Sequence, residues 1–72
     1  MNSSRFEPGD KVESYDNSGS ASVVKLVEFR DKLIGGDELW VGLLVRDTQG
    51  DTVKDSKPKS WRINPNAERV NL

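Results

Sequence analysis

The 72-residue chain contains no cysteine and no histidine. Without cysteine it can form neither a disulfide nor a thiolate metal site. Without histidine it lacks the commonest zinc ligand, the commonest general base and the usual pH switch near neutrality. A chain this short forms one small domain with a small core. We therefore expect no cofactor and no metal, and a fold held by apolar burial alone or by assembly with a partner.

Charge of either sign is not in large excess, since the chain has 11 basic and 12 acidic residues and a formal net charge of -1. Nonspecific binding to nucleic acid or to a membrane surface normally needs an excess of positive charge. The N-terminus lacks the apolar region of a signal peptide, and the longest apolar run, LWVGLLV, is too short to span a bilayer. These features predict a cytoplasmic protein that does not enter membranes.

Short alternating runs separated by turn residues predict an all-β fold. The expected strands are a first strand starting at Lys11, then SASVVKLVEF (20–29), ELWVGLLVRD (38–47), TVKD (52–55), SWRI (60–63) and RVNL (69–72). NPNAE predicts one helical turn before the last strand, with Asn64 as its cap and Pro65 at its first position. A helix over residues 23–34 is the alternative for the second run, but β-branched residues and the following Gly-Gly pair favour a strand.

The third run, ELWVGLLVRD, alternates most clearly. Its odd-numbered apolar residues share one face and are expected to fill the core: Leu39, Val41, Leu43 and Val45. Trp40 and Leu44 then point away from the core, unless the sheet curves enough to bury both faces. Gly42 in mid-strand predicts a bulge or a sharp bend. The second run is also apolar on both faces, which indicates strong curvature or an interface.

Both ends of the chain resemble the SH3-like barrels of the Tudor, KOW and ferredoxin-docking type. FEPGDKV (6–12) is similar to their entry into the first strand, and INPNAERVNL (63–72) is similar to their ending. The resemblance implies a small SH3-like barrel of about five short strands with one helical turn before the last strand. The barrel would occupy residues 6–72 after a disordered lead-in at residues 1–5. Phe6 would then lie under the barrel, and the Asp10 carboxylate would accept backbone hydrogen bonds at the Pro-Gly turn.

Three smaller families are similar in part. Type II dihydrofolate reductases share the opening and the ERVN ending (68–71); where they carry their catalytic Val-Gln-Ile-Tyr stretch, this chain has SWRI. The small ferredoxin-docking barrel of photosystem I and the variable chain of ferredoxin-thioredoxin reductase are similar in size and layout. Both are accessory barrels that support partner proteins. The resemblance implies an accessory role, with an oligomeric reductase-like subunit as an alternative.

The residue types present favour a binding module over an enzyme. The acidic residues are scattered, and no loop has calcium-loop spacing. With five aromatic residues in all, the chain is short of the aromatics needed for both a core and a methyl-lysine cage. We therefore predict a non-enzymatic protein-interaction or accessory module that binds a protein partner or self-associates. The predicted contact residues are Tyr15, Trp40, Leu44 and Arg46.

A second hypothesis concerns the locally basic segment KDSKPKSWR. Basic side chains around an aromatic residue are typical of single-strand nucleic-acid binding. The residues that would bind nucleic acid are Lys54, Lys57, Lys59, Trp61 and Arg62. The other interpretation is a solvated lysine-rich hairpin that discourages edge pairing, with Trp61 in the core. The interpretation as a solvated hairpin is favoured, because the rest of the chain is acidic.

Overall fold

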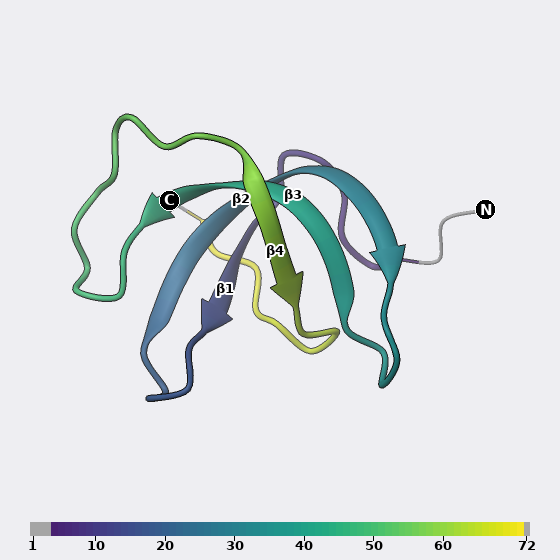
Figure 1. The fold of residues 1–72 in the computed structure, drawn as a ribbon. Coiled ribbons are helices and arrows are strands. Elements are labelled where there is room, and N and C mark those ends of the chain that lie inside the picture. The colour runs from purple at the N-terminus through teal and green to yellow at the C-terminus, as the bar shows by residue number, and fades with distance from the viewer. Residues whose placement is uncertain (1–3, 72) are drawn as a thin grey trace.

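The computed structural model describes residues 4–71, which form one strongly curved antiparallel sheet (Figure 1). Its strands are β1 (Lys11–Tyr15), β2 (Ala21–Lys32), β3 (Glu38–Arg46) and β4 (Lys59–Ile63), paired in the order β1-β2-β3-β4. The predicted all-β fold is confirmed, and residues 23–32 of the alternative helix belong to strand β2. The part of the chain that is described contains no helix, and so none that is long and apolar enough to cross a membrane.

The opening segment packs as its sequence suggests. Phe6 is almost completely buried, with 1% of its surface exposed. The Asp10 carboxylate accepts a hydrogen bond from the Glu7 backbone N–H at 2.9 Å, and the Asp10 N–H donates to the Glu7 carbonyl at 3.0 Å. Gly9 takes a φ of 96°, which glycine adopts without strain. Residues 1–3 of the expected lead-in lie outside the described residues, whereas Ser4 donates to the Glu38 carboxylate at 2.6 Å.

The C-terminal segment runs beside β1 but does not form a strand. One isolated antiparallel bridge joins Val12 to Arg69, and the Val70 N–H donates to the Lys11 carbonyl at 2.8 Å. The expected strand at 52–55 is likewise reduced to one bridge between Thr52 and Arg46. Residues 64–67 form a turn in which the Ala67 N–H donates to the Asn64 carbonyl at 3.0 Å. The sheet therefore has four strands and is not closed.

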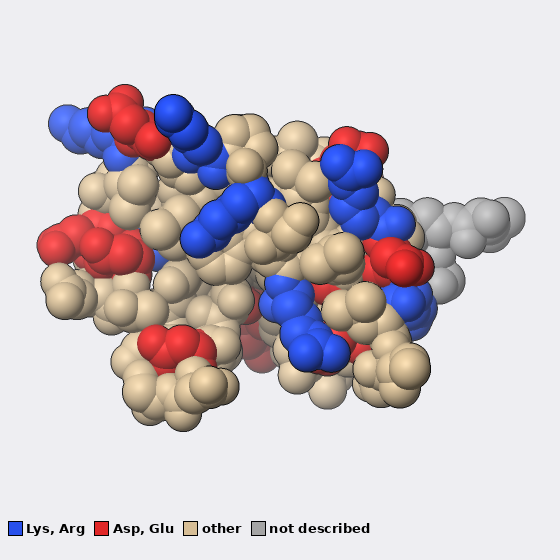
Figure 2. All heavy atoms as spheres, in the orientation of Figure 1, with Lys and Arg blue, Asp and Glu red and all other residues tan. Residues whose placement is uncertain are grey.

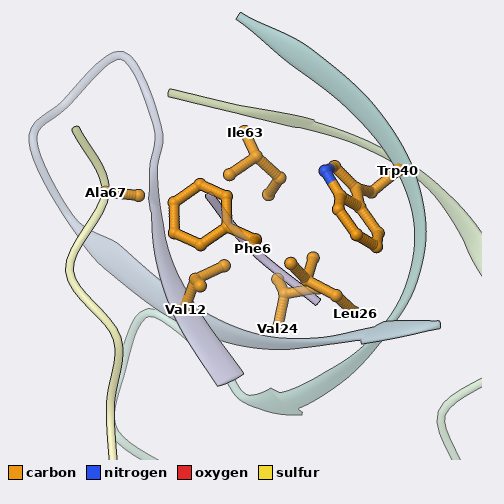
Figure 3. Packing of buried hydrophobic residues seen from close by; sticks show 7 residues of the cluster. All are labelled: Phe6, Val12, Val24, Leu26, Trp40, Ile63 and Ala67. Atoms are coloured by element: carbon orange, nitrogen blue, oxygen red, sulfur yellow. The ribbon is translucent and has the colours of Figure 1, made fainter. Parts of the chain in front are cut away.

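The curvature of the sheet comes from irregularities in the pairing of β2 with β3. The register shifts three times, between Val23 and Val24, between Leu26 and Glu28, and between Phe29 and Asp31. Such bulges bend a strand and increase its twist. Phe6, Val12, Val24, Leu26, Trp40, Ile63 and Ala67 meet inside the curve (Figure 3). The core therefore draws on all four strands, the opening segment and the final turn.

The expected orientation of β3 is wrong. Trp40 is completely buried and lies in the core, whereas Leu39, Val41, Leu43 and Val45 on the opposite face are only half-buried. The sheet wraps around the face that holds the larger aromatic residue, because the indole fills more of a small core than a Val or Leu side chain. Alternation identified two faces but not the one that turns inward.

Gly42 lies in β3 where side chains of β2 and β4 approach the backbone closely. A Cβ atom at this position would lie 2.6 Å from Cγ1 of Val24 and 3.1 Å from Cδ1 of Trp61. The bulge at Val27 lies beside the partner of Gly42, since Leu26 pairs with Gly42 and Glu28 with Val41. The mid-strand glycine thus marks the bend, as its position suggested, and the bulge itself is in β2.

Candidate protein-interaction site

One pocket of the described residues has a volume of about 420 Å³ and opens where β1 and β4 end. The end of β1, the residue before β3, the end of β4 and the turn that follows β4 form its walls. The lining residues are Glu13, Ser14, Tyr15, Asp37, Arg62, Asn64, Asn66, Ala67 and Glu68. These residues come from three separate regions of the sequence, so only the folded sheet brings them together.

Tyr15 and Glu13 form one wall of this pocket. They lie two residues apart in β1 and therefore point to the same side of the sheet. The Tyr15 hydroxyl donates to Oε1 of Glu13 at 2.9 Å. This bond, together with the negative charges of Glu13 and Glu68, raises the pKa of Tyr15 above its ordinary value of 10.0. Tyr15 remains 62% exposed, so much of its side chain is open to a partner.

Arg62 and Asp37 line another part of the pocket. Nε of Arg62 lies 3.0 Å from Oδ2 of Asp37, and Arg62 pairs with Leu39 across the β3–β4 ladder. The Arg62 side chain is 65% exposed, so this ion pair adds little stability. The pocket holds the three carboxylates of Glu13, Asp37 and Glu68 against this one guanidinium. Its net charge is therefore negative, which favours a positively charged ligand.

The carboxylates of the pocket do not form a metal site. Within residues 4–71, no three Asp or Glu side chains are placed to hold a metal ion together. Because the chain also lacks His and Cys, hydrogen bonding and charge are the chemistry that these residues offer a ligand. Asn64 and Asn66 add amide groups to the wall, although Oδ1 of Asn64 already accepts from the Asn66 N–H at 2.8 Å.

The four predicted contact residues are not brought together. Tyr15 lines the pocket, whereas Leu44 and Arg46 lie near the C-terminal end of β3 and do not. The Leu44 N–H donates to the Ser56 hydroxyl at 2.8 Å, and its side chain is half-buried. Trp40 has no exposed surface, so in this structure it cannot touch a partner. Tyr15 and the exposed Arg46 therefore remain available for contact, on different parts of the sheet.

The predicted nucleic-acid residues lie along the loop before β4 and along β4 itself. Lys54, Lys57 and Lys59 are exposed. The Lys59 ammonium lies 4.5 Å from the centre of the Trp61 ring, and the Trp61 indole N–H donates to the Gly42 carbonyl at 3.2 Å. One face of this half-buried indole is thus already covered by a cation. Arg62 belongs to the pocket at the far end of β4 rather than to this group.

Sequence reasoning missed Glu13, Asp37 and Glu68. Each looks like an ordinary solvated acid, and they are 24 and 31 residues apart along the chain. The backbone bond from the Glu13 N–H to the Glu68 carbonyl, 3.1 Å long, places the C-terminal segment against β1. The only local signal was the alternation that set Glu13 and Tyr15 on one side of β1.

Comparison of the chain with protein-family models, with curated proteins and with solved structures finds no match. The function of the protein is therefore inferred from the geometry of this chain alone.

Proposed function

We propose that the protein is a non-enzymatic interaction module whose acidic pocket binds a positively charged extended segment of a partner protein. The observation that carries this proposal is the meeting of three carboxylates beside an exposed tyrosine in one open pocket. A pocket of about 420 Å³ is at the small end of ligand sites, which suits one long side chain rather than a whole cofactor.

An arginine side chain suits the chemistry of this pocket best. Its planar guanidinium donates several hydrogen bonds and matches carboxylate geometry with two parallel bonds. The ring of Tyr15 offers a surface on which a guanidinium can stack. Arg62 already forms an ion pair with Asp37 at 3.0 Å, so the pocket contains one arginine–carboxylate interaction made within the chain itself. Glu13 and Glu68 are left to face the incoming cation.

The finer description of the fold belongs to the same proposal. The sheet would be the main part of an SH3-like barrel that the C-terminal segment closes against β1. The bridge between Val12 and Arg69 and the bond from Val70 N–H to the Lys11 carbonyl support this closure. This arrangement also holds Glu68 beside the pocket, so barrel closure and ligand binding would depend on the same segment. A cytoplasmic location is proposed with this function.

A nucleic-acid-associated role is the second candidate, favoured by the exposure of Lys54, Lys57 and Lys59 in one stretch. It requires bases to stack on Trp61, whose ring is covered on one side by Lys59. Binding of single strands would weaken steeply with salt and would quench the fluorescence of Trp61. Unchanged fluorescence on adding oligonucleotide at low salt would count against this role.

Fluorescence anisotropy with a labelled hexa-arginine peptide tests the favoured proposal. We expect the peptide to bind, and expect the double variant Glu13→Lys/Glu68→Lys to weaken binding at least about tenfold, because two attractive charges become repulsive. Glu7→Lys/Glu28→Lys is the matched control, since it makes the same change in net charge at two exposed residues outside the pocket. Near-UV circular dichroism of the packed aromatic side chains reports whether each variant is folded.

Two outcomes would overturn the proposal. Equal loss of affinity in the pocket variant and in Glu7→Lys/Glu28→Lys would mean that the peptide responds only to overall charge. Equal binding of a labelled hexa-glutamate peptide would mean that the pocket does not select cations. Selective loss in the pocket variant, with the control unchanged, supports the site.

A further inference from the structure

We propose that the pocket also receives a second copy of this chain, through the lysine-rich segment that leads into β4 and includes its first residue. This inference rests on the proposed function, because it assigns an occupant to the same pocket. The segment comprises residues 54–59, with the sequence KDSKPK, and is called the lysine segment below. Its three lysines and single aspartate give it a positive charge that is opposite to the charge of the pocket.

The lysine segment is held in place before any partner arrives. The Ser56 hydroxyl accepts a hydrogen bond from the Leu44 N–H at 2.8 Å, which ties the middle of the segment to β3. Pro58 restricts the backbone of the segment just before β4. The Lys59 ammonium lies over the Trp61 ring at 4.5 Å. Lys54 and Lys57 project from this anchored loop and are exposed. An ordered ligand loses less conformational entropy on binding, which favours even a small contact.

The lysine segment lies away from the pocket of its own chain. Lys59 is the first residue of β4, while Arg62 near the other end of the strand lines the pocket. The three residue steps from Lys59 to Arg62 span about 10 Å. Figure 1 shows the loop before β4 running away from the tip of the β4 arrow, and in Figure 2 basic side chains project from that edge of the molecule. The charge match is therefore available between two copies.

This placement fixes the type of assembly. A contact that uses different surfaces on the two copies is heterologous. Such contacts add copies one after another, and they give a closed ring or an open chain of copies. Each added copy brings one further pocket and one further lysine segment. The near-zero net charge of the chain, -1, leaves little overall repulsion to oppose this growth. We therefore expect short head-to-tail assemblies rather than a symmetric dimer.

Light scattering coupled to size-exclusion chromatography measures the mass of such assemblies directly. We expect the weight-average mass of the purified chain to rise with concentration at about 0.02 M salt and to return to that of one chain at about 0.5 M, where the Debye length falls from about 20 Å to about 4 Å. Strictly monomeric behaviour at low salt and high concentration would overturn the inference. If hexa-arginine still bound the pocket in that case, the proposed function would stand without self-association.

Charge reversal separates the two surfaces. Alone, Glu13→Lys/Glu68→Lys and Lys54→Glu/Lys57→Glu should each be monomeric, because pocket and lysine segment then carry charge of the same sign. Mixed in equal amounts, the two variants should associate again, since each reversed surface meets its complement on the other chain. Recovery in the mixture cannot arise from misfolding. No recovery would mean that this contact does not exist.

Lys32→Glu is the matched control for the lysine segment, because Lys32 is exposed at the end of β2 and is outside both surfaces. It should associate as the unmodified chain does, because its pocket and its lysine segment both keep their charge. Loss of association in Lys32→Glu would show that a change of net charge alone prevents assembly, and would overturn the assignment of these two surfaces.

Discussion

The indole N–H of Trp40 donates a 2.8 Å hydrogen bond to Oε1 of Glu38, and both residues are buried. The two side chains lie on the same side of β3, and the Ser4 hydroxyl donates to the same oxygen at 2.6 Å. A buried carboxylate is tolerated when donors satisfy it, and Glu38 has one from the core and one from the opening segment. This bond gives the largest buried side chain a fixed position.

Replacement of Trp40 should therefore lower the free energy of unfolding by more than the lost packing alone explains. In Trp40→Phe the core loses volume and Glu38 loses a buried donor, so we expect the free energy of unfolding to fall by about 2–4 kcal/mol. Urea denaturation followed by circular dichroism measures it. Trp61→Phe is the comparison, because that half-buried indole donates at 3.2 Å to a backbone carbonyl and should cost only about 1 kcal/mol. Equal losses would contradict the role of Glu38.

Gly42→Ala should destabilise the sheet by about 1–3 kcal/mol, because the added methyl group would meet Val24 at 2.6 Å. Shortening the neighbour tests this reason. In the double variant Gly42→Ala/Val24→Ala, part of the loss from Gly42→Ala should disappear, and a double-mutant cycle reports the coupling. Strict additivity would mean that the crowding comes from the Lys25 carbonyl or from Trp61 instead.

Phe6→Ala should lower the free energy of unfolding by about 3–5 kcal/mol, because Phe6 is buried in the core although it precedes every strand. For a domain of this size that is a large part of the total stability. Ile34→Ala removes an apolar side chain that is 98% exposed and should leave the denaturation midpoint unchanged. A stable Phe6→Ala protein would show that the opening segment is dispensable.

Tyr15 is the only tyrosine, so the phenolate absorbance of the protein reports this residue alone. We expect its titration midpoint to lie above 10.0. The midpoint should move back toward 10.0 in Glu13→Gln, because the charged carboxylate that accepts a hydrogen bond from the Tyr15 hydroxyl is gone. The folded state holds this proton more tightly than the unfolded chain. The interaction therefore stabilises the fold below pH 10.0 and is lost as the pH rises through the raised pKa.

The same titration reports the state of the pocket. Bound hexa-arginine should lower the Tyr15 midpoint, since arginine stays charged at this pH and favours the phenolate. The peptide should not move the midpoint in Glu13→Lys/Glu68→Lys. An unchanged midpoint in the unmodified protein at saturating peptide would place the peptide elsewhere on the surface.

The local features of the fold were predictable from the sequence. Turn chemistry at Pro8, Gly9 and Asp10 and alternation in β1 depend on neighbouring residues, and both are present as expected. The inward face of β3 was not predictable. Alternation defines two faces, but the choice between them depends on which face leaves less empty space once Phe6, Leu26 and Ile63 surround Trp40.

The sequence alone determined that this is a small all-β chain without thiol or imidazole chemistry, because composition and short-range periodicity carry that information. Only the tertiary structure decided that Glu13, Asp37 and Glu68 share a pocket with Tyr15. Their proximity arises from long-range pairing of the C-terminal segment with β1 and from the return of β3 beside β2. The electrostatic interaction between charges depends on their distance in space. Acids that are scattered along the sequence therefore act together on one ligand only when the curved sheet brings them close to each other.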